Sequence, residues 1–134
     1  MTEHDVVAAL QDRTRVILGQ FADVTVADDG SLGFTYAGAL CSLRAVALGP
    51  GLEVLALTSV LAWDRPSSGG LRAKVAARNA ESQFGSISLV GHGSQADVIL
   101  RYTFPATGLD DEPLMTMLVL VLSGVEKARV GLVP

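Results

Sequence analysis

Hydrophobic positions near the start of the chain recur at intervals of three and four residues, the spacing of one helix face. They are Val6, Val7, Leu10, Thr14, Ile17, Leu18 and Phe21. Thr2 followed by Asp5 is a capping-box pattern, which marks the beginning of a helix. Gly19 weakens helix formation at the other end of the segment. The pattern therefore predicts an amphipathic helix that begins at Thr2.

After this helix the pattern changes to runs rich in Val, Leu, Phe and Tyr, separated by turn residues. We expect strands at residues 24–26, 32–36, 40–48 and 52–63. The turn residues 28–31 (DDGS) and 49–51 (GPG) separate them. Because residues 52–63 form a long, β-branched and apolar run, we expect them to be a central strand that is buried along most of its length.

The second half of the chain alternates between helical spacing and the alternation of strands. Residues 64–70 predict a loop, residues 71–82 a helix, and residues 86–90 and 96–104 two strands joined by a turn. Residues 114–128 fit two patterns, because their helical spacing contains a continuous apolar run at 118–122. The length of the segment and its start at Asp110, Asp111 and Pro113 favour a helix.

The predicted element order is α-β-β-β-α-β-β-α. Strands joined by hairpins pair in antiparallel fashion, so the sequence predicts an α+β fold with a single antiparallel sheet of about five strands and helices packed on it. A chain of 134 residues without a linker or internal repeat is expected to form one domain, residues 1–134.

The charge content limits the choice of partners. Only 18% of the residues are charged while 49% are hydrophobic, so we expect apolar surface that a partner or a second copy of the chain covers. The alternative is a tight monomer with a surface rich in Gly and Ala. The net charge is -4 and no stretch of the sequence clusters Lys or Arg, so nucleic acid is not an expected partner.

The cysteine content, the N-terminal residues and the longest apolar run together indicate in which compartment the protein is expected. The single Cys41 excludes an intramolecular disulfide and a cysteine-based metal site within one chain. The N-terminal residues do not resemble a signal peptide, and the apolar run at 118–122 is too short to span a membrane. We therefore expect a cytoplasmic protein. The excess of Arg over Lys and the many Ala, Gly, Val and Asp residues are typical of a GC-rich bacterial genome.

The residues that could bind a metal or take part in catalysis are explained by structural roles. His4 and His92 have no second His and no Cys at metal-ligand spacing, which favours surface structural roles and no metal. Cys41 lies in an expected strand, as a buried structural residue. Residues 91–96 match the dinucleotide fingerprint G-x-G-x-x-A, but a strand follows them instead of the required helix. The acidic pairs lie at turns and at a helix start. We therefore expect no catalytic residue, no cofactor and no enzyme activity.

The expected binding surface involves Trp63 and the last helix. Trp63 ends the long strand, where we favour a lid over the core, although tryptophan is also common at binding hot spots. The last helix is apolar nearly all round, so we expect a partner subunit to cover part of it. The candidate binding residues are Trp63, Leu114, Met115, Met117, Leu118 and Leu122.

The second half of the chain resembles a known family. The residues that carry the resemblance are Asn79, Phe84, Gly85 and Ile87, then Val98, Leu100, Arg101, Tyr102 and Pro105, and finally Pro113, Leu114 and Val125. In this spacing they are similar to YbjN-like and Tir-chaperone-like (CesT-type) proteins, over about residues 52 to 130. The resemblance implies the fold of type III secretion chaperones. It also implies a homodimer that binds an extended segment of a client protein and catalyses nothing.

The same resemblance implies fold-forming roles for individual residues. Asn79 is expected to cap its helix, Phe84 to anchor the core and Gly85 to permit the turn. The main alternative to protein binding is a small-molecule-binding or regulatory domain with a pocket between sheet and helices. An enzyme that uses only Asp, Glu or Arg and a scaffold subunit are the remaining alternatives.

Overall fold

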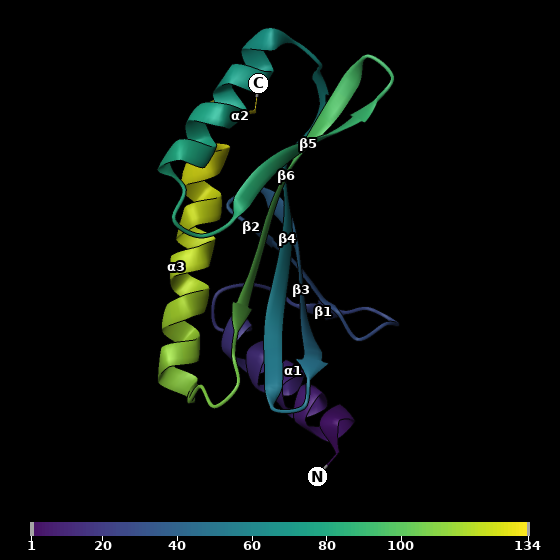
Figure 1. Cartoon of the computed structure of the whole chain (residues 1–134), viewed down its shortest axis with the longest axis vertical. Coiled ribbons are helices and arrows are strands. Elements are labelled where there is room, and N and C mark those ends of the chain that lie inside the picture. Colours follow the sequence, from purple (N-terminus) through teal and green to yellow (C-terminus); the bar gives the residue numbers. More distant parts are fainter. Residues whose placement is uncertain (1, 134) are drawn as a thin grey trace.

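The structure is a computed structural model, which describes residues 2–133. Its elements follow the predicted order with one more strand between the first two helices, and they form one sheet and three helices (Figure 1). The helices are α1 (Glu3–Leu18), α2 (Gly69–Glu81) and α3 (Asp111–Arg129). The strands are β1 (Thr25–Val26), β2 (Leu32–Tyr36), β3 (Ala39–Gly49), β4 (Leu52–Pro66), β5 (Ser86–His92) and β6 (Gln95–Pro105).

The first helix begins where the sequence predicts. The Thr2 side chain accepts a hydrogen bond from the Asp5 backbone N–H, and the Asp5 carboxylate accepts one from the Thr2 backbone N–H. This reciprocal pair is the predicted capping box, and it satisfies backbone donors that lack a partner within the helix. Leu10, Ile17 and Leu18 are buried, as the hydrophobic spacing requires.

All six strands form one antiparallel sheet, in the order β1-β2-β3-β4-β6-β5. The α+β fold class is therefore confirmed, with six strands where the sequence predicted about five. The count differs by β1, a two-residue pairing of Thr25–Val26 with β2, which corresponds to the short strand expected at residues 24–26. β4 lies at the centre, as predicted, and pairs with β3 on one side and β6 on the other.

The helices pack on one face of the sheet. Leu43 on β3, Leu57 on β4 and Leu100 on β6 are buried and point to this face. They belong to the same core cluster as Leu18 on α1 and Leu114 on α3. Figure 1 shows α2 and α3 side by side along the sheet, with α1 crossing near its lower end. Burial on alternate strand positions is the period-2 pattern of a sheet covered on one side.

The ambiguous last segment is a helix, as its length and its acidic start predicted. α3 buries Leu114, Leu118, Val121, Leu122, Val125 and Ala128 against the rest of the molecule. The Leu and Val residues of the run 118–122 belong to this helix, which contacts α1, β2, β3 and β4. Packing against several elements explains why the segment is apolar over so much of its circumference. Over residues 2–133, no helix is long and apolar enough to cross a membrane.

Asn79 and Gly85 fix the outer edge strand β5. The Asn79 side-chain amide donates to the Ile87 carbonyl (2.8 Å) and accepts from the Ile87 N–H (2.7 Å). The prediction that Asn79 caps its helix is therefore wrong, because its amide pairs with a strand edge as a neighbouring strand would. Gly85 has φ +108°, and a Cβ there would lie 2.9 Å from the Arg101 carbonyl oxygen. Only glycine fits this turn.

Three cationic side chains hold the end of the chain in place. Arg65 donates to the Leu132 carbonyl, Lys74 to that of Gly131 and Arg78 to that of Val130. These carbonyls follow the C-terminal end of α3, where the helix dipole favours positive charge. The contacts tie β4 and α2 to the end of α3 across the top of the molecule in Figure 1.

Candidate functional site: the open face of the sheet

Among the described elements, no helix covers the second face of the sheet. We call it the open face, and the register places on it every second residue of the central strands. Its residues are Leu40, Ser42 and Arg44 on β3, Ala56, Thr58, Val60 and Trp63 on β4, and Asp97, Ile99, Arg101 and Thr103 on β6. The corresponding residues of the other face fill the core, so the open face is the part of the sheet that a ligand can reach.

An apolar row crosses the open face. Leu40, Val60 and Ile99 are neighbours on three adjacent strands, because Leu40 pairs with Val60 and Val60 with Ile99. Leu40 is 50% exposed, and the exposed Val90 lies beyond the row on β5. A contiguous apolar row on a sheet whose other face is fully packed is the kind of surface that marks an interaction site.

Trp63 lies beside this row and is 55% exposed. The prediction that it forms a lid over the core is therefore wrong. The cause is a pair of irregularities in β4, where the pairing with β6 shifts between Val60 and Ala62 and again between Ala62 and Arg65. The first shift turns both Leu61 and Ala62 into the core, so Trp63 points to the open face.

Charged residues flank the apolar row on its two sides. On β6, Asp97 and Arg101 each lie two residues from Ile99 and point to the same face. Arg44 lies farther along, in the same half of the face as Arg101. The open face thus has an acidic end at Asp97 and Asp64, an apolar middle, and a basic half.

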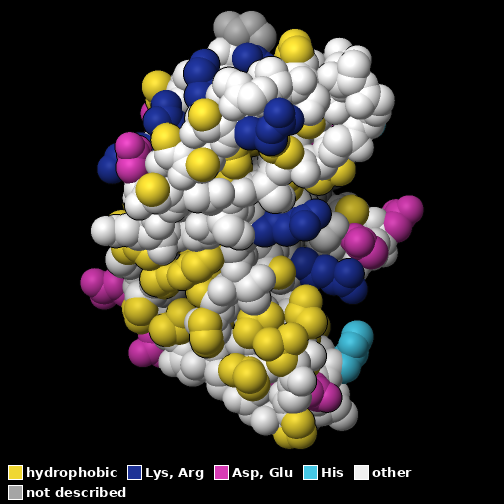
Figure 2. All heavy atoms as spheres, turned by 45° about the horizontal axis from the view of Figure 1, so that its top comes forward, with side chains coloured by type: hydrophobic (Ala, Val, Ile, Leu, Met, Phe, Trp, Pro, Cys, Tyr) yellow, Lys and Arg dark blue, Asp and Glu magenta, His cyan; other side chains and the backbone are white. Residues whose placement is uncertain are grey.

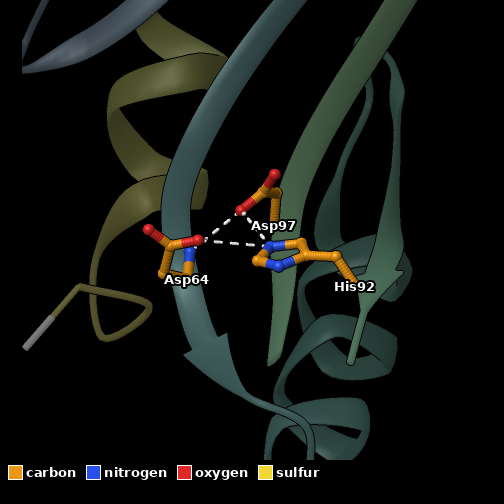
Figure 3. A group of neighbouring side chains, drawn as sticks. All are labelled: Asp64, His92 and Asp97. Carbon is orange, nitrogen blue, oxygen red and sulfur yellow. Dashed lines mark hydrogen bonds and ion pairs between the residues drawn. The ribbon is translucent and has the colours of Figure 1, made fainter. Parts of the chain in front are cut away.

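The acidic end contains a cluster of Asp64, His92 and Asp97 (Figure 3). The His92 Nε2 atom lies 3.0 Å from an Asp97 oxygen and 3.2 Å from an Asp64 oxygen. The three side chains come from β4, the end of β5 and β6, and converge on one point. His92 therefore has the surface position that the sequence predicted, together with two carboxylate partners that spacing along the chain did not reveal.

Backbone geometry sets the positions of the two carboxylates. Trp63 and Asp64 together face the single residue Asp97, and Asp64 has φ +51°, a conformation that Asp tolerates better than most residues. The Asp64 backbone N–H donates to the same Asp97 oxygen at 2.9 Å. This hydrogen bond, followed by that of His92, lowers the pKa of Asp97, so its carboxylate is charged at neutral pH.

The predicted binding residues on α3 lie mainly in the core. Leu114, Leu118 and Leu122 are at most 3% exposed, so a partner cannot reach them in the folded protein. Met115 and Met117 are half-buried and pack against the core cluster. The exposed apolar side chains of this helix are Val119 and Leu120, which the sequence reasoning did not single out.

Outside the open face, the surface carries a hydrophobic region, a basic region and two grooves. Figure 2 shows hydrophobic side chains gathered over the lower half of one face, and most Lys and Arg side chains in its upper half. A groove of about 320 Å³ lies between α2 and α3, lined by Arg78, Phe84 and Leu120 among others. A second, of about 410 Å³, lies between α1 and the segment around β1 and β2. Both grooves are open to solvent.

Cys41 is buried, as predicted, and is 1% exposed. Its Sγ lies 3.3 Å from the Ser59 hydroxyl on the neighbouring strand. Burial raises the pKa of the Cys41 thiol, which keeps it protonated and unreactive. The residue is thus a small core side chain in the folded protein.

Comparison with known proteins supports the fold. No family model and no curated protein matches the chain. Among solved structures, the crystal structure of YbjN from E. coli, a proposed transcription regulator, superposes with a TM-score of 0.66. The match covers 90% of this chain and 88% of that chain at 14% sequence identity. The chain therefore has the YbjN-like fold, as the resemblance in its second half implied.

Proposed function

We propose that this chain, on its YbjN-like fold, is a non-enzymatic, chaperone-like protein-binding module that self-associates through the open face of its sheet. The observation that carries the proposal is the apolar row of Leu40, Val60 and Ile99 beside the exposed Trp63. Burying such side chains contributes about 25 cal/mol per Å² of apolar surface, before the costs of association are subtracted. The resemblance to homodimeric chaperones points in the same direction.

A second copy of the chain fits this face because the acidic end of one copy can face the basic half of the other. Along β6, Asp97 and Arg101 lie on opposite sides of Ile99, each about 7 Å away for a strand rise of about 3.4 Å per residue. A two-fold axis that lies between the two facing sheets, perpendicular to β6 and over Ile99, places Arg101 of one copy over Asp97 of the other, twice. Two-fold symmetry is the commonest arrangement of homo-oligomers, and sheets packed face to face bury both apolar rows.

A charge swap tests this arrangement. Asp97→Arg alone places arginines opposite each other, and Arg101→Asp alone places aspartates opposite each other, so each variant is expected to be monomeric. When the two variants are mixed, an arginine of one faces an aspartate of the other at both contacts, so the mixture is expected to form a heterodimer. Light scattering on a size-exclusion column measures the mass against 14.0 kDa for one chain.

A substitution at Ile99, which lies next to the proposed two-fold axis, provides a second test. Ile99→Asp is expected to abolish self-association, whereas Val119→Asp, at an exposed valine of α3, is expected to leave it unchanged. Circular dichroism checks that each variant is folded. A wild-type protein that stays monomeric at high concentration, or a dimer that survives both Ile99→Asp and the single charge changes, would rule out the open face as the interface.

A further inference from the structure

The cluster of Asp64, His92 and Asp97 has more acceptor atoms than an ion pair needs. One imidazole N–H can make one well-aligned hydrogen bond, yet the His92 Nε2 atom faces two carboxylate oxygens, at 3.0 and 3.2 Å. All three ligand atoms lie within 4.8 Å of one another. Figure 3 shows that they point toward a shared centre and not past one another.

This spacing matches the coordination sphere of a small transition-metal ion. Zinc binds imidazole nitrogen and carboxylate oxygen at about 2.0 to 2.2 Å. Donor atoms around such an ion are then about 3.0 Å apart in octahedral geometry and about 3.4 Å apart in tetrahedral geometry, from the same bond lengths. The distances from His92 Nε2 to the two carboxylate oxygens, 3.0 and 3.2 Å, fall in this range.

The donor types select the class of metal. An imidazole nitrogen suits zinc, nickel, cobalt and copper, whereas magnesium and calcium prefer oxygen ligands alone. Two carboxylates balance the charge of a divalent ion. The hydrogen bond from the Asp64 backbone N–H to Asp97 orients one ligand, as outer-shell contacts commonly do in metal sites.

We propose that Asp64, His92 and Asp97 form a binding site for a divalent transition metal of the zinc class, with further coordination positions open to solvent. Strands β4, β5 and β6 carry the three ligands, so the site exists in the folded chain and does not need a partner subunit. Metal binding neutralises the acidic end of the open face.

Trp63 provides a built-in probe for this site. It is the only tryptophan, and it directly precedes the ligand Asp64. Nickel or cobalt, which have open d shells, are expected to quench its fluorescence in a saturable titration. Zinc has a filled shell and is expected to restore the fluorescence by displacing them, whereas magnesium is not.

Matched variants decide between this site and binding elsewhere. His92→Gln is expected to weaken nickel binding by more than about tenfold, since even outer-shell changes in metal sites act on this scale. His4→Gln, at the other histidine, is expected to leave binding unchanged. Asp64→Asn keeps a residue that tolerates the positive φ and removes a charged ligand, so it is expected to act like His92→Gln.

Quenching that is equal in the wild type, His92→Gln and Asp64→Asn would overturn the proposal, as would the absence of saturable quenching in the wild type. Isothermal titration with zinc gives the stoichiometry, which is expected to be one ion per chain. His92→Gln leaves Asp97 and Arg101 in place, so loss of metal binding and loss of self-association remain separate results.

Discussion

The two faces of the sheet differ in how they use the same strands. On β6, Leu100 is fully buried under the helices, while its neighbours Ile99 and Arg101 point to the open face. The covered face is mainly apolar and buried, with Ser59 as a buried polar residue beside Cys41. The open face mixes an apolar row with charged ends, so its residues contribute little to folding and are available for recognition.

This contrast also explains why the most informative residues lie at irregular positions. The shifts in β4 turn Trp63 outward and bring Asp64 next to Asp97. A regular strand would have continued the alternation from Val60 and turned Trp63 into the core. Bulges are common near functional sites, where they reorient a side chain.

The largest expected effect compares adjacent residues on the two faces. Leu100→Ala removes a fully buried side chain and is expected to lower the free energy of unfolding by about 2 to 5 kcal/mol. Ile99→Ala is expected to lower it by less than about 1 kcal/mol in the monomer, because the side chain is only half-buried. Urea denaturation at low protein concentration measures both. Equal losses would show that the open face is covered within one chain.

A smaller effect is expected where α2 protects the edge of the sheet. Asn79→Ala removes two hydrogen bonds to Ile87 and is expected to cost about 1 to 2 kcal/mol of unfolding free energy. It also exposes the Ile87 backbone groups, which hydrogen exchange of the Ile87 amide would report. Gln83→Ala, which shortens an exposed amide side chain nearby, is the control and is expected to change neither quantity.

The smallest effect concerns the acidic end of the open face. Hydrogen bonds from Asp64 and His92 lower the pKa of Asp97 in the folded protein. Such a group stabilises the fold above its unfolded pKa of about 3.9, and this contribution is lost as pH falls through the lower folded pKa. The melting temperature of the wild type is therefore expected to fall more between about pH 5 and about pH 3 than that of Asp97→Asn. Parallel acid profiles would contradict the pKa shift.

Much of the fold could be predicted because its signals are local. The capping box at Thr2, the hydrophobic spacing of α1 and the turn residues before β2 act over a few residues, and the structure agrees with them. The ambiguous segment of α3 was also placed correctly, because its length favoured a helix over a strand. The predictions that failed concern which residues contact each other in the folded chain, such as the roles of Asn79 and Trp63.

The candidate site was hidden from the sequence for the same reason. His92 has no second histidine or cysteine at metal-ligand spacing, and its carboxylate neighbours come from two other strands. The candidate residues Leu114, Leu118 and Leu122 were chosen for their apolar character. That character indicates burial, but it does not distinguish burial in the core from burial by a partner.

The sequence by itself determined which segments are helices and strands, that the strands pair through hairpins, and that the chain has more apolar residues than its charges can balance. These properties follow from backbone preferences and hydrophobic periodicity, which act along the chain. Only the tertiary structure decided which face the helices cover, where Trp63 points and which carboxylates meet His92. These depend on strand register, and a shift of one residue in register reverses every side chain that follows it.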